Sequence, residues 1–237
     1  MLVAARFATT RILCGLLILG LSGLVVSPVA RIFHWTRLRR DWRTGQVVMV
    51  ETLSPVSCRV ILDLCGGTGS WSDPYRNAGY DVRVVDPLNG GGDVRLFEAQ
   101  NAHGILAAPP CTHFSVSGAR WWKGKGVEAL LDGLSVVDAC LRIIFACKPV
   151  WWALENPVGR LRNYLGQPKM SFNPCDYGDP YTKRTYLWGD FNPPMKKNRV
   201  LPSEGSKMHR LPPSVDRWRL RSKTPIGFAM AFFEANK

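Results

Sequence analysis

Short apolar runs alternate with longer helix-like segments from about residue 59 to the end of the chain. Four runs have the length of buried strands, at residues 59–64, 80–85, 103–108 and 150–154. Between the last two, residues 127–147 place apolar side chains at helical spacing, and Pro149 ends that pattern. A shorter helix is predicted over 74–78, before Gly79, and an apolar helix closes the chain.

Strands that alternate with helices in this way are typical of the α/β class. The pattern therefore predicts a mostly parallel sheet with helices on both faces. In such open sheets, ligands bind beyond the carboxyl ends of the strands. The residues that follow each predicted strand are accordingly the first candidates for a functional site.

Two of these strand ends carry reactive side chains. The run 103–108 leads into Pro109-Pro110-Cys111, and the run 150–154 leads into Glu155-Asn156. A thiolate and a carboxylic acid at one sheet edge can attack a pyrimidine ring and protonate it. For Cys111 the alternative is a buried core cysteine, and for Glu155 it is a surface salt bridge or a helix cap.

A third strand end carries a glycine-rich turn. The run 59–64 continues into Asp63-Leu64-Cys65-Gly66-Gly67-Thr68-Gly69, which is not the spaced G-x-G-x-x-G pattern of dinucleotide enzymes. Its glycines allow a tight turn and close backbone approach to a ligand. Asp86, at the end of the next strand, can accept hydrogen bonds from ribose hydroxyls. The pattern predicts a site for an adenosine-containing cofactor.

These three motifs, in this order, resemble those of the DNA cytosine-5 methyltransferase family, and the resemblance covers roughly residues 60–236. It implies a Rossmann-like S-adenosylmethionine-dependent methyltransferase fold. It also implies S-adenosylmethionine as the cofactor and duplex DNA as the partner, with the target base flipped out of the helix. We expect a monomer.

The resemblance implies roles for individual residues. Cys111 is the nucleophile, Glu155 is the acid that also grips the exocyclic amine, and Arg184 orients the flipped base. The spacing to Gly189 allows a second alignment that puts Lys183 in this position, and a solvated basic hairpin is the alternative for both. Cofactor contacts are implied for Asp63, Cys65, Gly66, Gly67, Thr68, Gly69, Asp86, Asp93, Pro109 and Thr224. Substrate contacts are implied for Pro110, Ser115, Asn156 and Lys183. A plain turn at Asp93 and ordinary helix capping at Thr224 remain alternatives.

The chain departs from the family in the segment between Gly189 and Thr224. Members that read a sequence carry a large recognition domain there, whereas this chain has a short basic insert, residues 190–223, that contains Trp218. Basic residues with an aromatic can follow a phosphate backbone and stack on a base. We therefore expect weak or very short sequence preference. Trp121 and Trp122 either insert beside a flipped base or pack in the core.

Composition adds a basic balance and a distinct amino-terminal segment. The formal net charge is +13, which favours an anionic partner such as nucleic acid. Seven cysteines form no C-x-x-C pair, so neither zinc nor a disulfide framework is expected. Residues 49–237 are predicted to form the catalytic domain, and residues 1–48 a basic extension. Within it, residues 12–30 form an apolar stretch at the lower limit for a membrane span.

Three interpretations of the extension stay open: a start codon placed too early, with Met49 opening the protein, a membrane anchor facing the cytosol, or an added helix. The expected location is cytoplasmic, with membrane anchoring as the alternative. Two functional alternatives to DNA methylation also remain. One is a catalytically silent protein that binds nucleic acid, and the other is an enzyme that methylates another pyrimidine, RNA or a free nucleotide.

Overall fold

A computed structural model describes residues 37–40, 47–50 and 59–237. The apolar stretch 12–30 lies outside the described residues. Strands β1 (Arg37–Arg40) and β2 (Val47–Val50) pair antiparallel in a sheet of two strands, and β2 spans the domain boundary predicted between residues 48 and 49. Over the described ranges, no helix combines the length and the apolar character that crossing a membrane requires.

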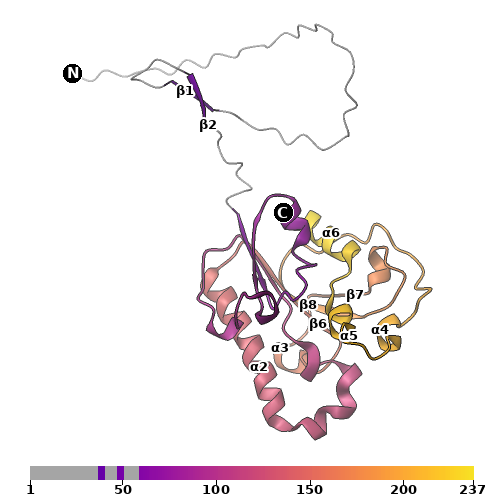
Figure 1. The fold of residues 1–237 in the computed structure, drawn as a ribbon. Coiled ribbons are helices and arrows are strands. Elements are labelled where there is room, and N and C mark those ends of the chain that lie inside the picture. Colours follow the sequence, from indigo (N-terminus) through magenta and orange to yellow (C-terminus); the bar gives the residue numbers. More distant parts are fainter. Residues whose placement is uncertain (1–36, 41–46, 51–58) are drawn as a thin grey trace. The chain divides into compact units, whose positions relative to one another are not determined.

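The main sheet has six strands in the order β4-β3-β5-β6-β8-β7 (Figure 1). The first four are mutually parallel, β8 runs antiparallel to β6, and β7 runs antiparallel to β8. This arrangement confirms the predicted mostly parallel α/β sheet. The strands are β3 (Val60–Leu64), β4 (Asp81–Val85), β5 (Gly104–Ala107), β6 (Trp151–Pro157), β7 (Met170–Phe172) and β8 (Thr185–Asp190).

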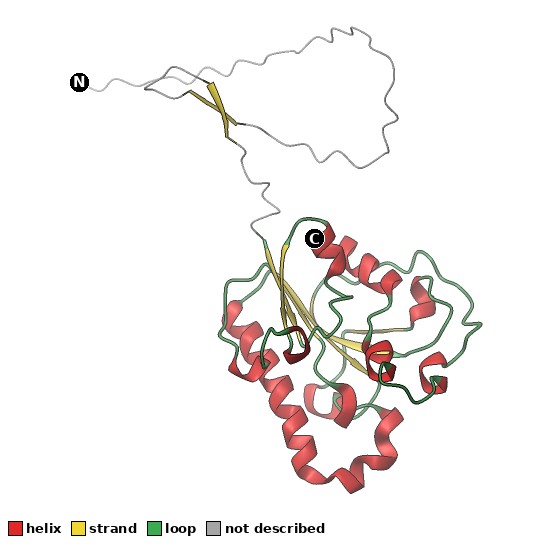
Figure 2. Ribbon diagram, in the orientation of Figure 1, coloured by secondary structure: helices red, strands yellow, loops and turns green. Residues whose placement is uncertain are grey.

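Helices cover both faces of this sheet, as predicted (Figure 2). Helix α2 (Trp122–Cys147) packs its buried residues Cys140 and Ile144 against one face. Helices α1 (Asp73–Asn77) and α6 (Ile226–Ala235) cover the other face, where Tyr75 and Phe232 are fully buried. Each set of helices buries an apolar layer against one face of the sheet. The two layers hold the sheet in place and thereby fix the ends of its strands.

Strand β6 is longer than the apolar run predicts. Its ladder with β8 pairs Glu155 with Leu187 and Asn156 with Tyr186, so both residues lie within the strand rather than after it. Helix α2 begins five residues earlier than predicted and contains a non-helical residue, Gly126. An antiparallel partner can extend a strand through polar positions, because it satisfies their backbone groups.

Several short elements connect these strands. The 3-10 helices are η1 (Pro87–Asn89), η2 (Val94–Leu96), η3 (Cys111–His113), η4 (Val116–Trp121) and η5 (Pro174–Tyr177). The remaining α-helices are α3 (Arg162–Leu165), α4 (Lys207–Arg210) and α5 (Arg217–Ser222), and the last two belong to the basic insert. Elements η3 and η4 are the next elements after β5, and η3 begins with the candidate nucleophile Cys111.

Candidate active site

A cleft of about 910 Å³ lies where β3, β4, β5 and β6 end, and most of the predicted site residues line it. Its lining includes the glycine-rich loop, residues 65–68, together with Cys111 and Glu155. It also includes six cationic side chains that we call the basic lining: Arg120, Lys125, Lys183, Arg184, Arg217 and Arg221. The cleft thus brings together three motifs that are spread over about ninety residues of the sequence.

Asp63, the last but one residue of β3, lies under the glycine-rich loop with only 1% of its surface exposed. Ser72 Oγ donates a hydrogen bond of 2.5 Å to Asp63 Oδ2, whereas Oδ1 is buried with no partner among the described residues. Burial raises the pKa of this carboxyl group to about 7. The Gly66 backbone lies so close to the carboxylate that any side chain at Gly66 would overlap it.

The loop is also tied to β4 through Asp86. The backbone N–H groups of Gly67 and Leu88 donate to the two carboxylate oxygens of Asp86, each over 2.9 Å. Cys65 has a φ of 57°, a left-handed conformation that is costly for a residue with a side chain. A strained backbone held by several contacts is typical of ligand-binding turns.

These observations fit S-adenosylmethionine. The unpartnered Oδ1 of Asp63 suits an ammonium donor, and Gly66 lets the loop backbone lie directly on the Asp63 carboxylate. Thr224 lines the same cleft. Its backbone N–H donates to Ser70 Oγ at 2.9 Å, which ties it to the residue after the glycine-rich turn. Pro109 and Thr68 also line the cleft.

Two of the predicted cofactor contacts are not brought to the cleft. Asp93 is not among its lining residues, and its carboxylate binds Arg95 instead. The hydrogen bond from Arg95 holds the pKa of Asp93 below its usual value. Gly69 also lies outside the lining and supplies a turn carbonyl to Ser72 and Asp73. For both residues, the structure favours a local structural role.

Cys111 and Glu155 come from neighbouring parallel strands. Ala107 on β5 pairs with Leu154 on β6, so Glu155 is one residue beyond this pair and Cys111 is four residues beyond it. Asn156 Nδ2 donates a 2.8 Å hydrogen bond to the carbonyl of Pro109, which joins the two strands just behind the cleft. Asn156 itself is fully buried and does not line the cleft, so it fixes the nucleophile loop rather than facing a substrate.

The loop that carries Cys111 is held onto the segment after β6. Val116 N–H donates to the Val158 carbonyl at 2.9 Å, and Arg160 N–H donates to the Phe114 carbonyl at 2.9 Å. The guanidinium Nε of Arg160 also donates to the His113 carbonyl at 2.7 Å. Gly159 is required at this crossing, because a side chain there would overlap the Phe114 carbonyl. Nucleophile and acid therefore share one rigid support.

Burial dominates the electrostatics of this pair. It raises the pKa of the Cys111 thiol, and the nearby Glu155 carboxylate raises that pKa further, while Lys183 and Arg221 lower it. Burial also raises the pKa of Glu155, which Lys183 opposes. Burial thus shifts Glu155 toward its protonated form, and two cations lie where they lower the pKa of the Cys111 thiol.

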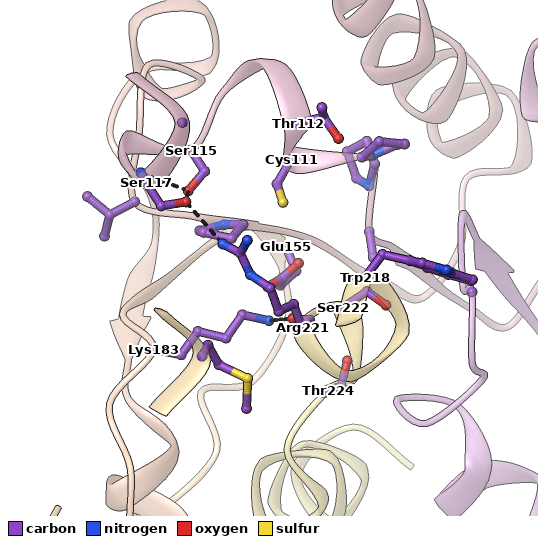
Figure 3. A pocket seen from close by; sticks show the side chains of 18 of the residues that line it. Cys111, Thr112, Ser115, Ser117, Glu155, Lys183, Trp218, Arg221, Ser222 and Thr224 are labelled. Carbon is purple, nitrogen blue, oxygen red and sulfur yellow. Dashed lines mark hydrogen bonds between the residues drawn. The ribbon is translucent and has the colours of Figure 1, made fainter. Parts of the chain in front are cut away.

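Lys183 and Arg221 form a connected pair over the Cys111 loop (Figure 3). Lys183 Nζ donates to the Arg221 carbonyl at 2.9 Å, and Arg221 Nη2 donates to Ser117 Oγ at 3.3 Å. Arg184, the residue that the sequence placed first, lines the cleft but is exposed. No sequence motif distinguishes Arg221, which is one of nine lysine and arginine residues in the insert, so it was not predicted as a site residue.

Tryptophan side chains also reach the cleft. Trp121 is 58% exposed and Trp218 is 52% exposed, and both line it, so Trp121 is not a core residue. Trp122 is half-buried, with the Arg160 guanidinium 4.4 Å above its ring. Pro110 and Ser115 line the cleft as well. Across residues 59–237 and the two short strands, no three metal-ligating side chains converge.

Comparisons with known proteins identify no family. No family model matches the chain, and no curated protein matches it. Among solved structures, the chain is similar to a protein encoded in an E. coli prophage that is described as a DNA modification methyltransferase. The two are 21% identical with a TM-score of 0.38, and the match covers 56% of this chain and 46% of that one. A likeness at this level does not by itself identify an activity.

Proposed function

We propose that this protein transfers a methyl group from S-adenosylmethionine to carbon 5 of cytosine in DNA, through a covalent bond between Cys111 and the base. One observation carries the proposal. Cys111, just after β5, and Glu155, on the neighbouring parallel strand β6, line the same cleft as the glycine-rich loop. That loop packs on the buried Asp63 carboxylate, one oxygen of which has no hydrogen-bond partner. The resemblance of these motifs to the cytosine-5 methyltransferases supports the same chemistry.

The first step needs a nucleophile and an acid at once, because carbon 5 of cytosine reacts poorly on its own. The Cys111 thiolate adds to carbon 6 while Glu155 gives its proton to ring nitrogen 3, which makes carbon 5 electron-rich. Burial raises the pKa of Glu155, which favours the protonated form that this step needs. Lys183 and Arg221 stabilise the thiolate, which burial otherwise disfavours.

When bound, S-adenosylmethionine would supply an electrophilic methyl group to carbon 5, and S-adenosylhomocysteine would be the leaving group. The proton on carbon 5 is then lost to solvent, and the bond between Cys111 and carbon 6 breaks, which restores the thiolate. Glu155 takes back the proton from ring nitrogen 3. At the end of the cycle, both side chains have returned to their starting states.

The cofactor is held by the residues around the glycine-rich loop. Asp63 Oδ1 would accept a hydrogen bond from the ammonium group, beneath a loop that Gly66 lets pack directly on this carboxylate. Asp86 binds the ribose hydroxyls with the lone pairs that its two backbone hydrogen bonds leave free. Thr224 completes the site from the start of α6.

The basic lining supports a polyanionic substrate. Its six cations share the cleft with the reactive pair, and they suit the phosphate groups beside a target base. The helices of the insert, α4 and α5, have four and six residues. Such short elements offer few side chains for reading base edges, which supports a weak or very short sequence preference.

The test incubates the full chain with methyl-labelled S-adenosylmethionine and, separately, duplex DNA, RNA or dCTP, followed by digestion to nucleosides. We expect label in 5-methyldeoxycytidine for the unmodified protein and for Cys147→Ala, whose cysteine does not line the cleft. We expect none for Cys111→Ala. Label in RNA or the nucleotide alone would contradict a DNA substrate. Absence of label despite measurable cofactor binding would indicate a silent nucleic-acid-binding protein.

A further inference from the structure

Two indole rings lie exposed in the cleft, and the rest of the described chain does not cover them. Trp121 ends η4 and Trp218 lies on α5, nearly a hundred residues later, yet both line the space that contains Cys111. Each exposes more than half of its surface. Large aromatic side chains are usually well buried, so two exposed rings in one functional cleft indicate a ligand with flat faces.

The charges around these rings define the ligand further. Arg120 and Arg217 directly precede the two tryptophans and belong to the basic lining. The Arg120 guanidinium lies 4.9 Å from the centre of the Trp121 ring. The only acidic side chains lining the cleft are Glu155 and, beside the glycine-rich loop, Asp63 and Asp86. Aromatic planes among cations match a nucleic acid strand whose bases are unstacked.

A base-paired duplex does not offer these planes, because its bases stack on each other. Reading the edges of a duplex requires a helix or a ribbon that enters a groove. Helix α5 has six residues and presents Trp218 and Arg221 to the cleft that contains the nucleophile (Figure 3). Its geometry suits contact with bases that have left the stack, at the place where the target cytosine must lie.

We propose that the cleft binds a locally unpaired DNA strand, and that Trp121 and Trp218 stack on the bases that flank the target cytosine. This inference rests on the proposed function and names the form of its substrate. Stacking tolerates any base, because every base has an aromatic face. The protein therefore prefers single-stranded or mismatched sites over perfect duplex, with little dependence on the flanking sequence.

The first test measures binding of a fluorescent single-stranded oligonucleotide to the full chain carrying Cys111→Ala, so that no turnover occurs. Trp218→Ala and Trp121→Ala should each weaken binding by roughly five- to a hundredfold. Leu220→Ala, on the same short helix, and Val127→Ala, on α2, are the matched controls. Both residues are exposed and lie outside the cleft, so neither change should alter binding.

A second measurement separates stacking from damage to the fold. Oligonucleotides that lack one base beside the target cytosine should bind less tightly to the Cys111→Ala protein. A base deleted on one side of the cytosine is the partner of one tryptophan only. The Ala variant of that tryptophan should bind the deleted strand no worse than the intact strand, whereas the Ala variant of the other tryptophan should still lose affinity. Trp218→Phe should restore most of the binding and its sensitivity to the missing base. The salt dependence of binding should stay unchanged in all tryptophan variants, since no phosphate contact is lost.

Two results would overturn the inference. One is a tryptophan variant that loses the same affinity on the intact strand and on both strands that lack a base, 5′ or 3′ of the cytosine. The other is tighter binding to perfect duplex than to the single strand. Neither readout involves methyl transfer. If the effects of a tryptophan variant and of a missing base are coupled but no methylation occurs, only the proposed reaction is refuted. If methylation occurs without this coupling, only the stacking is refuted.

Discussion

The buried carboxyl group of Asp63 should make the stability of the free protein fall as the pH rises, and Asp63→Asn should remove this dependence. In the folded chain, burial raises the pKa of Asp63 from 3.8 to about 7. Between these values the folded state holds a proton that the unfolded state has lost. The free energy of unfolding therefore decreases with rising pH across this window, and it levels off above pH 7.

The expected magnitude follows from the difference in pKa. A difference of about three corresponds to on the order of 4 kcal/mol in total, of which about 3 kcal/mol falls between pH 5 and pH 8. Asparagine has nearly the same shape as protonated aspartate and does not ionise. It can still accept the hydrogen bond from Ser72. Asp63→Asn should therefore match the unmodified protein at pH 5 and exceed its stability at pH 8.

Urea unfolding of both proteins at pH 5 and pH 8, without cofactor, measures this difference by linear extrapolation. We expect the advantage of Asp63→Asn to grow by about 3 kcal/mol between the two pH values. The same variant should bind S-adenosylmethionine more weakly, because its side chain no longer offers a charged acceptor. An advantage that is equal at both pH values would refute the reasoning about Asp63.

Three further predictions concern the loop and the reactive pair. Gly66→Ala should abolish detectable S-adenosylmethionine binding in calorimetry and cost about 1–3 kcal/mol of stability, because the new methyl group overlaps the Asp63 carboxylate. Asn156→Ala should cost about 1–3 kcal/mol in urea unfolding, since the Pro109 carbonyl loses its buried donor, and it should slow methyl transfer on the order of a hundredfold. Lys183→Met should shift the alkylation of Cys111 by iodoacetamide, followed by peptide mass spectrometry, to higher pH, because Lys183 lowers the pKa of that thiol.

Each of these changes has a matched control elsewhere in the chain. Gly124→Ala adds a methyl group with no neighbour within 4 Å, and it should leave cofactor binding intact. Asn198→Ala and Lys197→Met alter exposed residues outside the cleft, so stability and alkylation should stay unchanged. Normal cofactor binding by Gly66→Ala would contradict the role of the close contact with Asp63. Full activity of Asn156→Ala would contradict the role of its hydrogen bond to Pro109. An unshifted alkylation profile for Lys183→Met would contradict the effect of Lys183 on the Cys111 thiol.

Four of the six strands of the main sheet could be predicted from the sequence, whereas β7 and β8 were not predicted. The central strands β3 and β5 are buried on both faces and therefore read as continuous apolar runs. The end of β6 could not, since Glu155 and Asn156 are polar and are strand residues only through their ladder with β8. The glycine-rich loop and Cys111 were predictable because local motifs follow strands, and the sheet brings strand ends together.

The cationic part of the site depended on tertiary structure. Arg221 reaches Ser117 across about a hundred residues, and nothing in its sequence neighbourhood distinguishes it from the other basic residues of the insert. Asp93 shows the opposite case, because a carboxylate at the expected place in the sequence is bound by Arg95 two residues later. Likewise, whether Trp121 packs in the core or is exposed depends on tertiary packing, which residue spacing alone does not encode.

The most direct test of the central claim is a search for the covalent bond between Cys111 and the base. DNA that carries 5-fluorodeoxycytidine should trap the protein in the presence of S-adenosylmethionine, because fluorine cannot leave carbon 5 as a proton does. The account predicts a denaturation-resistant complex whose cross-linked peptide contains Cys111, and no complex with Cys111→Ala. A trapped complex that persists in Cys111→Ala, or methylation of cytosine by that variant, would contradict it.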